Sequence, residues 1–165
     1  DPAVISQLVE LVTKEGKSPK TEFVGKSAKY ILDKIGITVG DDVKVILMEA
    51  KEDHPFVQVE LMMPILPLVR VPDVDQAIEM AVRVEHGNRH TAMMHSRNVE
   101  KLTKMAKLIQ TTIFVKNGPS YAGIGVGGEG YTTFTIAGPT GEGLTSAKSF
   151  ARRRRCVLVG GMDVR

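Results

Sequence analysis

Apolar residues recur at spacings of three and four in four stretches of the chain, the pattern of a helix with one buried face. The stretches are 4–12, 28–35, 73–86 and 98–109. Gly16 is the predicted stop of the first helix. Asp73 can cap the third, with Gln76 completing a capping box, and Asn98 can cap the fourth. The sequence therefore predicts four amphipathic helices.

Short apolar runs of strand length lie between these stretches, at 43–48, 66–71, 91–95 and 112–115. Because the runs are apolar on both faces, they suit strands that are covered on both sides, as in a parallel sheet. From residue 66 to residue 115 the order is strand, helix, strand, helix, strand, which predicts two successive βαβ crossovers. The predicted fold class is α/β.

The pattern changes after Val115. A glycine-rich stretch at 117–130 is followed by an alternating segment at 131–136, a turn-rich stretch at 138–143 and a last apolar run at 156–159. Isolated strands with few partners in their own chain are usually covered by another subunit, so we expect a homo-oligomer formed through this tail. The expected organisation is an α/β part at 1–116, a pocket-lining loop and β segment at 117–143, and a tail with an oligomerisation strand at 144–165.

Composition bounds the class of protein. The chain has 165 residues, 42% hydrophobic and 25% charged, which suits one globular domain with a core. No stretch approaches the ~18 apolar residues of a membrane span, so no membrane partner is expected. A single cysteine, Cys156, allows no internal disulfide and favours a reducing compartment. The net charge is +3, and much of the excess lies in 152–155, a run of arginines without interleaved aromatics. That run favours a solvated strand entry over nucleic-acid binding.

The glycines at 123–128 satisfy the letters G-x-G-x-x-G. A dinucleotide fingerprint needs such glycines to open a helix that receives the pyrophosphate, whereas these lead into a strand pattern. A shaped loop that lines a pocket fits better.

The histidines, the cysteine and one glutamate are weaker candidates for a functional role. His86 and His90 have a spacing that suits metal ligands, but no matching pair completes a zinc site, so no metal is expected. His95 lies in an apolar strand pattern, typical of a core histidine. Cys156 lies in a strand pattern typical of a small buried cysteine. Glu60 precedes a wholly apolar segment and is either a solvated boundary residue, which its spacing alone favours, or a carboxylate held in a cleft to bind a hydroxyl. From the residues alone, no catalytic group can be assigned.

Three motifs in order resemble one family. Glu60–Pro67, with the letters ELMMPILP, resembles the segment of aldehyde dehydrogenases whose glutamate binds the nicotinamide ribose. Residues 113–159 resemble the C-terminal region of CoA-acylating propionaldehyde dehydrogenases, and His90–Ser96 resembles the strand before that region. The resemblance covers nearly the whole chain, and it implies the later part of the α/β catalytic domain plus a β extension for oligomerisation.

The resemblance also implies an activity for the parent enzyme. A cysteine thiolate attacks a short aliphatic aldehyde such as propionaldehyde or acetaldehyde, hydride passes to NAD, and the thiol of coenzyme A takes the acyl group from the enzyme. The family's nucleophilic cysteine would lie upstream of Asp1, so we expect a fragment that has no catalytic residue and is inactive alone. The alternative is a self-sufficient oligomeric module that binds a nucleotide or coenzyme A without catalysis.

The resemblance assigns roles to five residues. Glu60 would bind the coenzyme ribose, Met62 would pack near the nicotinamide, and Pro119, Ser120 and Tyr121 would border the aldehyde pocket. The letters around Ser120 resemble the propanediol-utilisation enzymes more than the ethanolamine-utilisation ones. Both kinds are cytoplasmic and work inside bacterial microcompartments, and their targeting segment is N-terminal.

Overall fold

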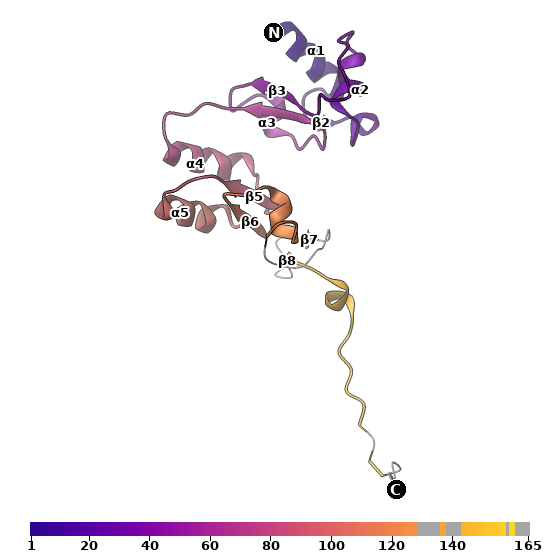
Figure 1. Cartoon of the computed structure of the whole chain (residues 1–165), viewed down its shortest axis with the longest axis vertical. Helices are drawn as coiled ribbons and strands as arrows, with labels where there is room; N and C mark the ends of the chain where they lie inside the picture. Colours follow the sequence, from indigo (N-terminus) through magenta and orange to yellow (C-terminus); the bar gives the residue numbers. More distant parts are fainter. Residues whose placement is uncertain (129–135, 138–142, 158, 161–165) are drawn as a thin grey trace. The chain divides into compact units, whose positions relative to one another are not determined.

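The structure is a computed structural model that describes residues 1–128, 136–137, 143–157 and 159–160. The chain divides into two compact units, Asp1–Val84 and Glu85–Arg165. Each unit is described by itself (Figure 1). No helix in the described ranges is long and apolar enough to cross a membrane.

The first unit opens with helix α1 (Pro2–Val12), whose first turn is capped by Asp1 through a 2.8 Å bond from the Ala3 N–H. The helix ends four residues before Gly16, the predicted stop. Thr13 ends it by turning extended, and its hydroxyl donates to the Val9 carbonyl at 2.6 Å. The chain then forms a small hairpin of β1 (Thr13–Lys14) and β2 (Ser18–Pro19). Gly16 therefore serves the turn of this hairpin and not the end of the helix.

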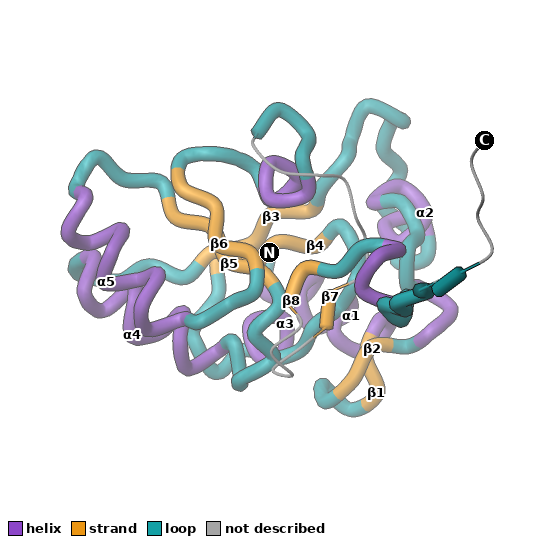
Figure 2. Tube along the Cα trace, turned by 90° about the horizontal axis from the view of Figure 1, so that it is seen from below, coloured by secondary structure: helices purple, strands orange, loops and turns teal. Residues whose placement is uncertain are grey.

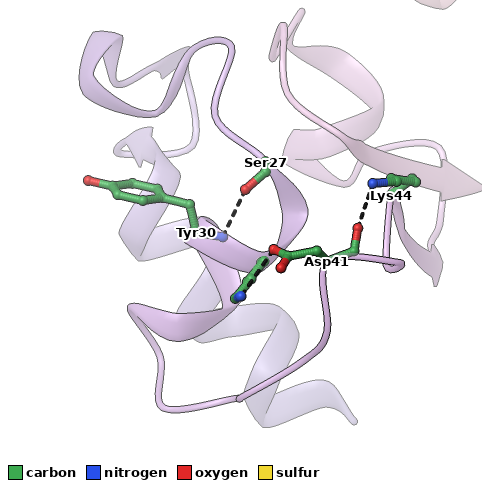
Figure 3. A network of polar contacts seen from close by, with 5 residues as sticks. Ser27, Tyr30, Asp41 and Lys44 are labelled. Atoms are coloured by element: carbon green, nitrogen blue, oxygen red, sulfur yellow. Dashed lines mark hydrogen bonds and ion pairs between the residues drawn. The ribbon is translucent and has the colours of Figure 1, made fainter.

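A short 3-10 turn, η1 (Thr21–Phe23), leads to α2 (Ala28–Asp33). Ser27 caps α2, because its hydroxyl oxygen accepts a hydrogen bond from the Tyr30 N–H at 3.2 Å (Figure 3). The loop that follows is held by Asp41, which pairs with Lys29 at 3.0 Å and accepts a bond from Lys44 on its carbonyl oxygen. These contacts connect the predicted second helix to the start of the sheet.

The sheet of the first unit contains β3 (Ile46–Glu49) and β4 (Ile65–Leu68), which run parallel with Ile46 opposite Ile65. One turn of helix, α3 (Pro55–Gln58), lies between them in the chain. The core of the unit joins α1, α2, α3 and the sheet through a cluster of buried side chains: Leu8, Val12, Phe23, Ile31, Met48, Phe56, Leu61 and Ile65. The predicted strands are thus present, each shorter than its apolar run.

The two faces of this sheet differ in burial. Met48 and Ile65 point into the core, whereas Leu47, Leu66 and Leu68 on the other face are 59%, 51% and 50% exposed. The first unit by itself therefore covers this sheet on one face only, and the expectation of cover on both faces is not met within this unit. The core of the unit packs against the face of Met48 and Ile65, and no element of this unit covers the apolar residues of the second face.

Helix α4 (Val74–Val84) closes the first unit. Asp73 caps it as predicted, with a 2.9 Å bond from the Gln76 N–H. The Gln76 side chain donates to the carboxylate of Asp73 at 3.0 Å, in place of the backbone bond of a capping box. These hydrogen bonds from Gln76 lower the pKa of Asp73. Within the same unit, Arg83 on α4 binds the carboxylate of Glu52 through two bonds of 2.8 and 3.1 Å.

The second unit is built on a βαβ crossover. Strands β5 (Thr91–Met94) and β6 (Ile113–Lys116) are parallel and lie side by side, with Thr91 opposite Ile113 (Figure 2). Helix α5 (Val99–Ile109) connects them and buries Leu102, Met105 and Ile109. Asn98 caps α5 as predicted, accepting a bond from the Lys101 N–H at 3.1 Å. This crossover confirms the second of the two predicted; the first would span the two units and stays a prediction.

Beyond β6 the chain forms η2 (Ser120–Ile124), a two-strand pairing of β7 (Ile136–Ala137) with β8 (Gly143–Leu144), and η3 (Ala147–Phe150). Most of the predicted alternating segment and of the turn-rich stretch after it lies outside the described residues. The predicted terminal strand at 156–159 forms no strand at Cys156, Val157 or Val159, all of which are exposed. A strand formed with a second subunit stays a prediction.

Candidate functional site

Glu60 lies on a short connection between α3 and β4 that is anchored in the core on both sides. Phe56, four residues before it, is 3% exposed, and Leu61, directly after it, is 6% exposed. Between these anchors Glu60 is exposed, and in the described structure its carboxylate has no hydrogen-bond or ion-pair partner. A carboxylate that is held in place and left unpaired can accept hydrogen bonds from the hydroxyls of a ligand.

Met62 is fixed through its backbone while its side chain is free. Its φ is +54°, a left-handed conformation that is uncommon for a residue other than glycine. Its carbonyl oxygen accepts a hydrogen bond from the Gly25 N–H at 3.1 Å. The side chain is 57% exposed. No local sequence pattern indicates this backbone conformation, which leaves a flexible apolar side chain exposed two residues after Glu60.

The connection continues directly into the sheet. The Ile46 N–H donates to the Pro64 carbonyl at 2.8 Å, and the Ile65 N–H donates to the Met63 carbonyl at the same distance. The first bond extends the pairing of β3 and β4 to Pro64, and the second is a tight local turn at the start of β4, so the position of Glu60 depends on the sheet as well as on the core. Rigid elements hold a binding residue more accurately than a free loop does.

His54 was not singled out by the sequence, yet it begins this region. It is the N-cap residue of α3, and its Nδ1 accepts a hydrogen bond from the Phe56 N–H at 3.1 Å. Its ring meets the ring of Phe56 edge to face, with centroids 5.2 Å apart. Burial lowers the pKa of His54, and the nearby charge of Asp53 only partly opposes this. Histidine is not among the preferred capping residues, so sequence patterns for caps could not find it.

An open hollow of about 540 Å³ lies next to His54. It is lined by Glu49, Ala50, Lys51, Asp53, His54 and Pro55. The lining carries charges of both signs and the face of a half-buried imidazole. Solvent therefore reaches the group that caps α3.

Pro119, Ser120 and Tyr121 come together in one turn of the second unit. Pro119 begins η2, its carbonyl accepts a bond from the Ala122 N–H at 3.0 Å, and the Tyr121 carbonyl accepts one from the Val126 N–H at 3.0 Å. Tyr121 is 61% exposed. The turn thus presents an aromatic side chain and a hydroxyl on its surface. Glu60 and Met62 belong to the other unit.

Glycine packing explains why this turn lies close to its strand. A Cβ at Gly123 would collide with the Ile113 side chain and would lie 3.3 Å from a methyl of Val115, both on β6. The 123–128 glycines therefore lie at the end of a 3-10 turn packed on a strand, and no α-helix begins among the described residues up to Gly128. This agrees with the rejection of a dinucleotide fingerprint, and it shows a structural use for the first of the glycines.

The remaining candidates from the sequence are solvent-exposed. His86, His90 and His95 are all exposed, so the expectation that His95 is a core residue is wrong: β5 ends at Met94, one residue before it. Cys156 is also exposed in the described tail, contrary to the buried position expected for it. No cluster of three or more His, Cys, Asp or Glu side chains that could hold a metal ion occurs among the described residues.

Curated relatives match nearly the whole chain. The CoA-propanoylating propanal dehydrogenase of Salmonella typhimurium is 52% identical over 165 residues, which is 99% of this chain and 35% of the relative. The acetylating acetaldehyde dehydrogenase EutE of Escherichia coli is 51% identical over 95% of this chain and 34% of its own length. The chain thus spans about a third of the length of the curated relatives it matches.

Solved structures of propionaldehyde dehydrogenases are also similar to this chain. A propionaldehyde dehydrogenase of Rhodopseudomonas palustris, with bound CoA and an acylated cysteine, has a TM-score of 0.89 and 70% identity over 100% of this chain and 38% of that one. A propionaldehyde dehydrogenase from a fucose utilisation microcompartment of Clostridium phytofermentans has a TM-score of 0.86 and 48% identity, over 100% of this chain and 38% of that one. Residues 43–141 match the model of the aldehyde dehydrogenase family. These residues make up more than half of the chain, and the chain belongs to the aldehyde dehydrogenase family.

Proposed function

We propose that the protein containing this chain is a CoA-acylating aldehyde dehydrogenase, which converts a short aliphatic aldehyde into an acyl-CoA with NAD as the hydride acceptor. The observation that carries this proposal is 52% identity to a CoA-propanoylating propanal dehydrogenase along 99% of the chain. A related structure holds CoA together with an acylated cysteine, which supports an acyl-enzyme route. Another related structure, an engineered glycolyl-CoA reductase, holds NADP⁺, which supports a nicotinamide coenzyme.

Glu60 is the residue that we assign to the coenzyme. Its exposed carboxylate stands on a connection anchored by Phe56 and Leu61. An ionised carboxylate accepts hydrogen bonds and donates none, so it suits the two hydroxyls of a ribose. When bound, the coenzyme supplies the acceptor for hydride. The protein's part at this position is to bind and orient the ribose.

Met62 is assigned to the apolar contact beside the nicotinamide. Its left-handed backbone and the hydrogen bond from Gly25 fix its Cα, while its unbranched side chain stays 57% exposed. A thioether chain with three rotatable bonds adapts to a flat ring without a rigid pocket.

Pro119, Ser120 and Tyr121 are assigned to the wall of the aldehyde pocket. The phenol of Tyr121 is exposed, and the turn that carries it is packed on β6 through Gly123. Propionaldehyde and acetaldehyde differ by one methylene, which supports a discrimination of only ~1–3 kcal/mol. We therefore expect the protein to accept both aldehydes.

The nucleophile is assigned to a cysteine outside these 165 residues. Cys156 is the single cysteine of the chain and lies exposed in the tail. Among the described residues, no His, Asp or Glu side chain forms a hydrogen bond or ion pair with this thiol, so none is in place to act as its base. The chain alone is accordingly expected to be inactive.

The tail is assigned to a homo-oligomer contact. Phe150, Val157 and Val159 are 72%, 68% and 90% exposed. Phe150 lies in η3 and the two valines lie in the tail after it, and apolar side chains as open as these are commonly covered by another subunit. The relative from a fucose utilisation microcompartment also supports a cytoplasmic enzyme that works inside such a compartment.

One experiment tests the proposal. The product of the complete gene is assayed for NADH formation with propionaldehyde and CoA, omitting each substrate in turn, and the 165-residue chain is assayed in parallel. We expect turnover that requires all three substrates in the first case and none in the second. Turnover by the chain alone would return Cys156 to consideration. Saturable binding of NAD or CoA by the complete gene product without any turnover would favour the alternative, a binding module.

A further inference from the structure

We propose that His54 is a proton-sensitive helix cap that positions Glu60, so that the neutral imidazole favours coenzyme binding and the protonated one disfavours it. The inference rests on the proposed role of Glu60. It starts from the 3.1 Å hydrogen bond that the Phe56 N–H donates to His54 Nδ1. The first N–H groups of a helix have no partner within the helix, so a cap residue must accept from them.

Only a neutral imidazole can accept this bond. A ring nitrogen that accepts a hydrogen bond carries no proton, so Nδ1 is the bare nitrogen and Nε2 carries the hydrogen. When the ring takes up a second proton, both nitrogens become donors. The Phe56 N–H would then face another N–H, and the ring would have to leave its place beside Phe56. Histidine thus differs from Ser, Asp or Asn as a cap, because protonation near neutral pH removes its function.

The surroundings favour the neutral ring. Burial lowers the pKa of His54, and the charge of Asp53 raises it by less. Other charged groups near His54 are Glu49 and Lys51, which line the same hollow. On the far side of Pro55 the charged groups belong to the α1–β2 region: Glu10, Lys14, Glu15 and Lys20. Of these charges, that of Asp53 acts on the pKa of His54 and raises it, by less than burial lowers it.

Glu52 does not reach the ring as a free charge. Its carboxylate is held by Arg83 through bonds of 2.8 and 3.1 Å, and its carbonyl oxygen accepts a bond from the Gln58 side chain at 2.6 Å. The bond from Gln58 closes the loop before α3 onto the last residue of the helix. Glu52, two residues before His54, is therefore held both by α4 and by the last residue of α3. A change at the His54 cap then acts on α3 itself.

The path from the cap to Glu60 is one helical turn. The carbonyl oxygen of His54 accepts from the N–H groups of Val57 and Gln58, at 2.9 and 3.2 Å. The Val59 N–H then donates to the Pro55 carbonyl at 2.9 Å, and Glu60 is the next residue. A helix of four residues has little stability of its own, because one turn is only the costly nucleus of a helix. Removal of its cap therefore loosens the residue at its end.

The sign of the effect follows from the direction of the pKa shift. The folded pKa of His54 lies below its ordinary value of 6.5. Below pH 6.5 the unfolded chain takes up the proton first, so the stability that the neutral cap contributes is present above that pH. It is lost as the pH falls toward the folded pKa. Affinity for the coenzyme should fall over the same range.

The test compares four forms of the complete gene product between pH 7.5 and pH 5.5: the unmodified protein, His54→Asn, His54→Ala and His86→Asn. Asparagine is a preferred cap that does not titrate. His86 is an exposed histidine outside α3 with a left-handed φ that asparagine tolerates, so it is the matched control. The measured quantity is the dissociation constant for NAD, by fluorescence titration.

We expect the unmodified protein and His86→Asn to bind NAD about fivefold more weakly at the lower pH, the size of effect that the loss of one helix cap gives. His54→Asn should bind equally well at both pH values, and His54→Ala should bind weakly at both. A pH dependence that persists unchanged in His54→Asn would overturn the proposal. This comparison does not depend on whether His54→Ala folds.

Hydrogen exchange of residues 54–62 gives a readout that needs no coenzyme. After correction for intrinsic rates, protection of this segment should fall at pH 5.5 in the unmodified protein and stay constant in His54→Asn. If NAD fails to bind at any pH while this difference in protection is seen, the proposed function is wrong and the titrating cap stands. Equal protection in both proteins at both pH values would overturn the cap itself.

Discussion

The Gly25 N–H donates a hydrogen bond to the Met62 carbonyl oxygen at 3.1 Å, and both residues have left-handed backbone angles, with φ of +72° and +54°. Gly25 precedes α2, and Met62 precedes β4. Two unusual backbone conformations thus meet in one hydrogen bond, two residues along the chain from Glu60. The bond couples the loop before α2 to the residues that we assign to the coenzyme.

Replacement of Gly25 by alanine should weaken both the fold and the site. No described atom lies within 4 Å of a Cβ at this position, so the cost comes from the left-handed backbone, about 1–2 kcal/mol. Relaxation of Gly25 would also move its N–H away from Met62. Thermal unfolding and NAD affinity, both on the complete gene product, measure the two effects. Gly36→Ala is the matched control, because Gly36 has a φ of +77° and equally open surroundings. An equal loss of NAD affinity in that control would contradict the coupling.

Glu60→Gln should lower coenzyme affinity without changing the melting temperature. The substitution keeps the shape and removes the charge, and a hydrogen bond to a charged group is worth about 1 kcal/mol more than a neutral one. We therefore expect the KM for NAD to rise about fivefold. Glu22→Gln, at another exposed glutamate, is the control for the loss of charge. An unchanged KM would remove Glu60 from the coenzyme site.

Periodicity predicted the elements of this chain well where a helix has a long apolar face. The stretches at 73–86 and 98–109 correspond to α4 and α5, including the capping roles of Asp73 and Asn98. The end of α1 was missed because Thr13, which has no special stop signal, turns the chain before Gly16 does. The spacing of apolar side chains indicates which face of a helix is buried. It contains little information on the residue at which the helix ends.

The sequence predicted the residues of the candidate site only in part. Glu60 and Met62 could be named through resemblance, but the left-handed φ of Met62 depends on its bond to Gly25, 37 positions earlier in the chain. A contact between residues so far apart leaves no local pattern. His54 was missed for a different reason, since its role as a cap appears only once its ring is seen beside the Phe56 N–H.

Gly123→Ala should destabilise the second unit. The added methyl would collide with Ile113, a buried residue of β6, and overpacking of this kind costs about 1–3 kcal/mol. Gly118→Ala is the comparison, because its Cβ would approach a Val115 methyl at 3.3 Å and Ala122 at 3.7 Å, which small side-chain shifts can relieve. We expect a larger fall in melting temperature for Gly123→Ala. Equal effects would show that the turn moves freely relative to β6.

Arg83→Gln should make the stability of the protein less sensitive to acid, because the substitution removes a contribution that only the ionised pair gives. Hydrogen bonds from Arg83 lower the pKa of Glu52 below 4.5, so the pair contributes stability above that pH and loses it as the pH falls. Because both side chains are partly exposed, the effect at pH 7 should be small. Melting temperatures at pH 7 and pH 4 check this, with Arg97→Gln as the control for charge. An equal loss of acid sensitivity in the control would contradict a specific role for the pair.

The apolar outer face of the β3–β4 sheet bears on the solubility of the isolated 165-residue chain. Leu47, Leu66 and Leu68 form an apolar strip on a sheet of only two strands, each with one neighbour among the described residues. Exposed apolar faces and unpaired strand edges promote association between copies of a chain. We expect the isolated chain to precipitate as its concentration rises, and a charged substitution at Leu66 to keep it in solution.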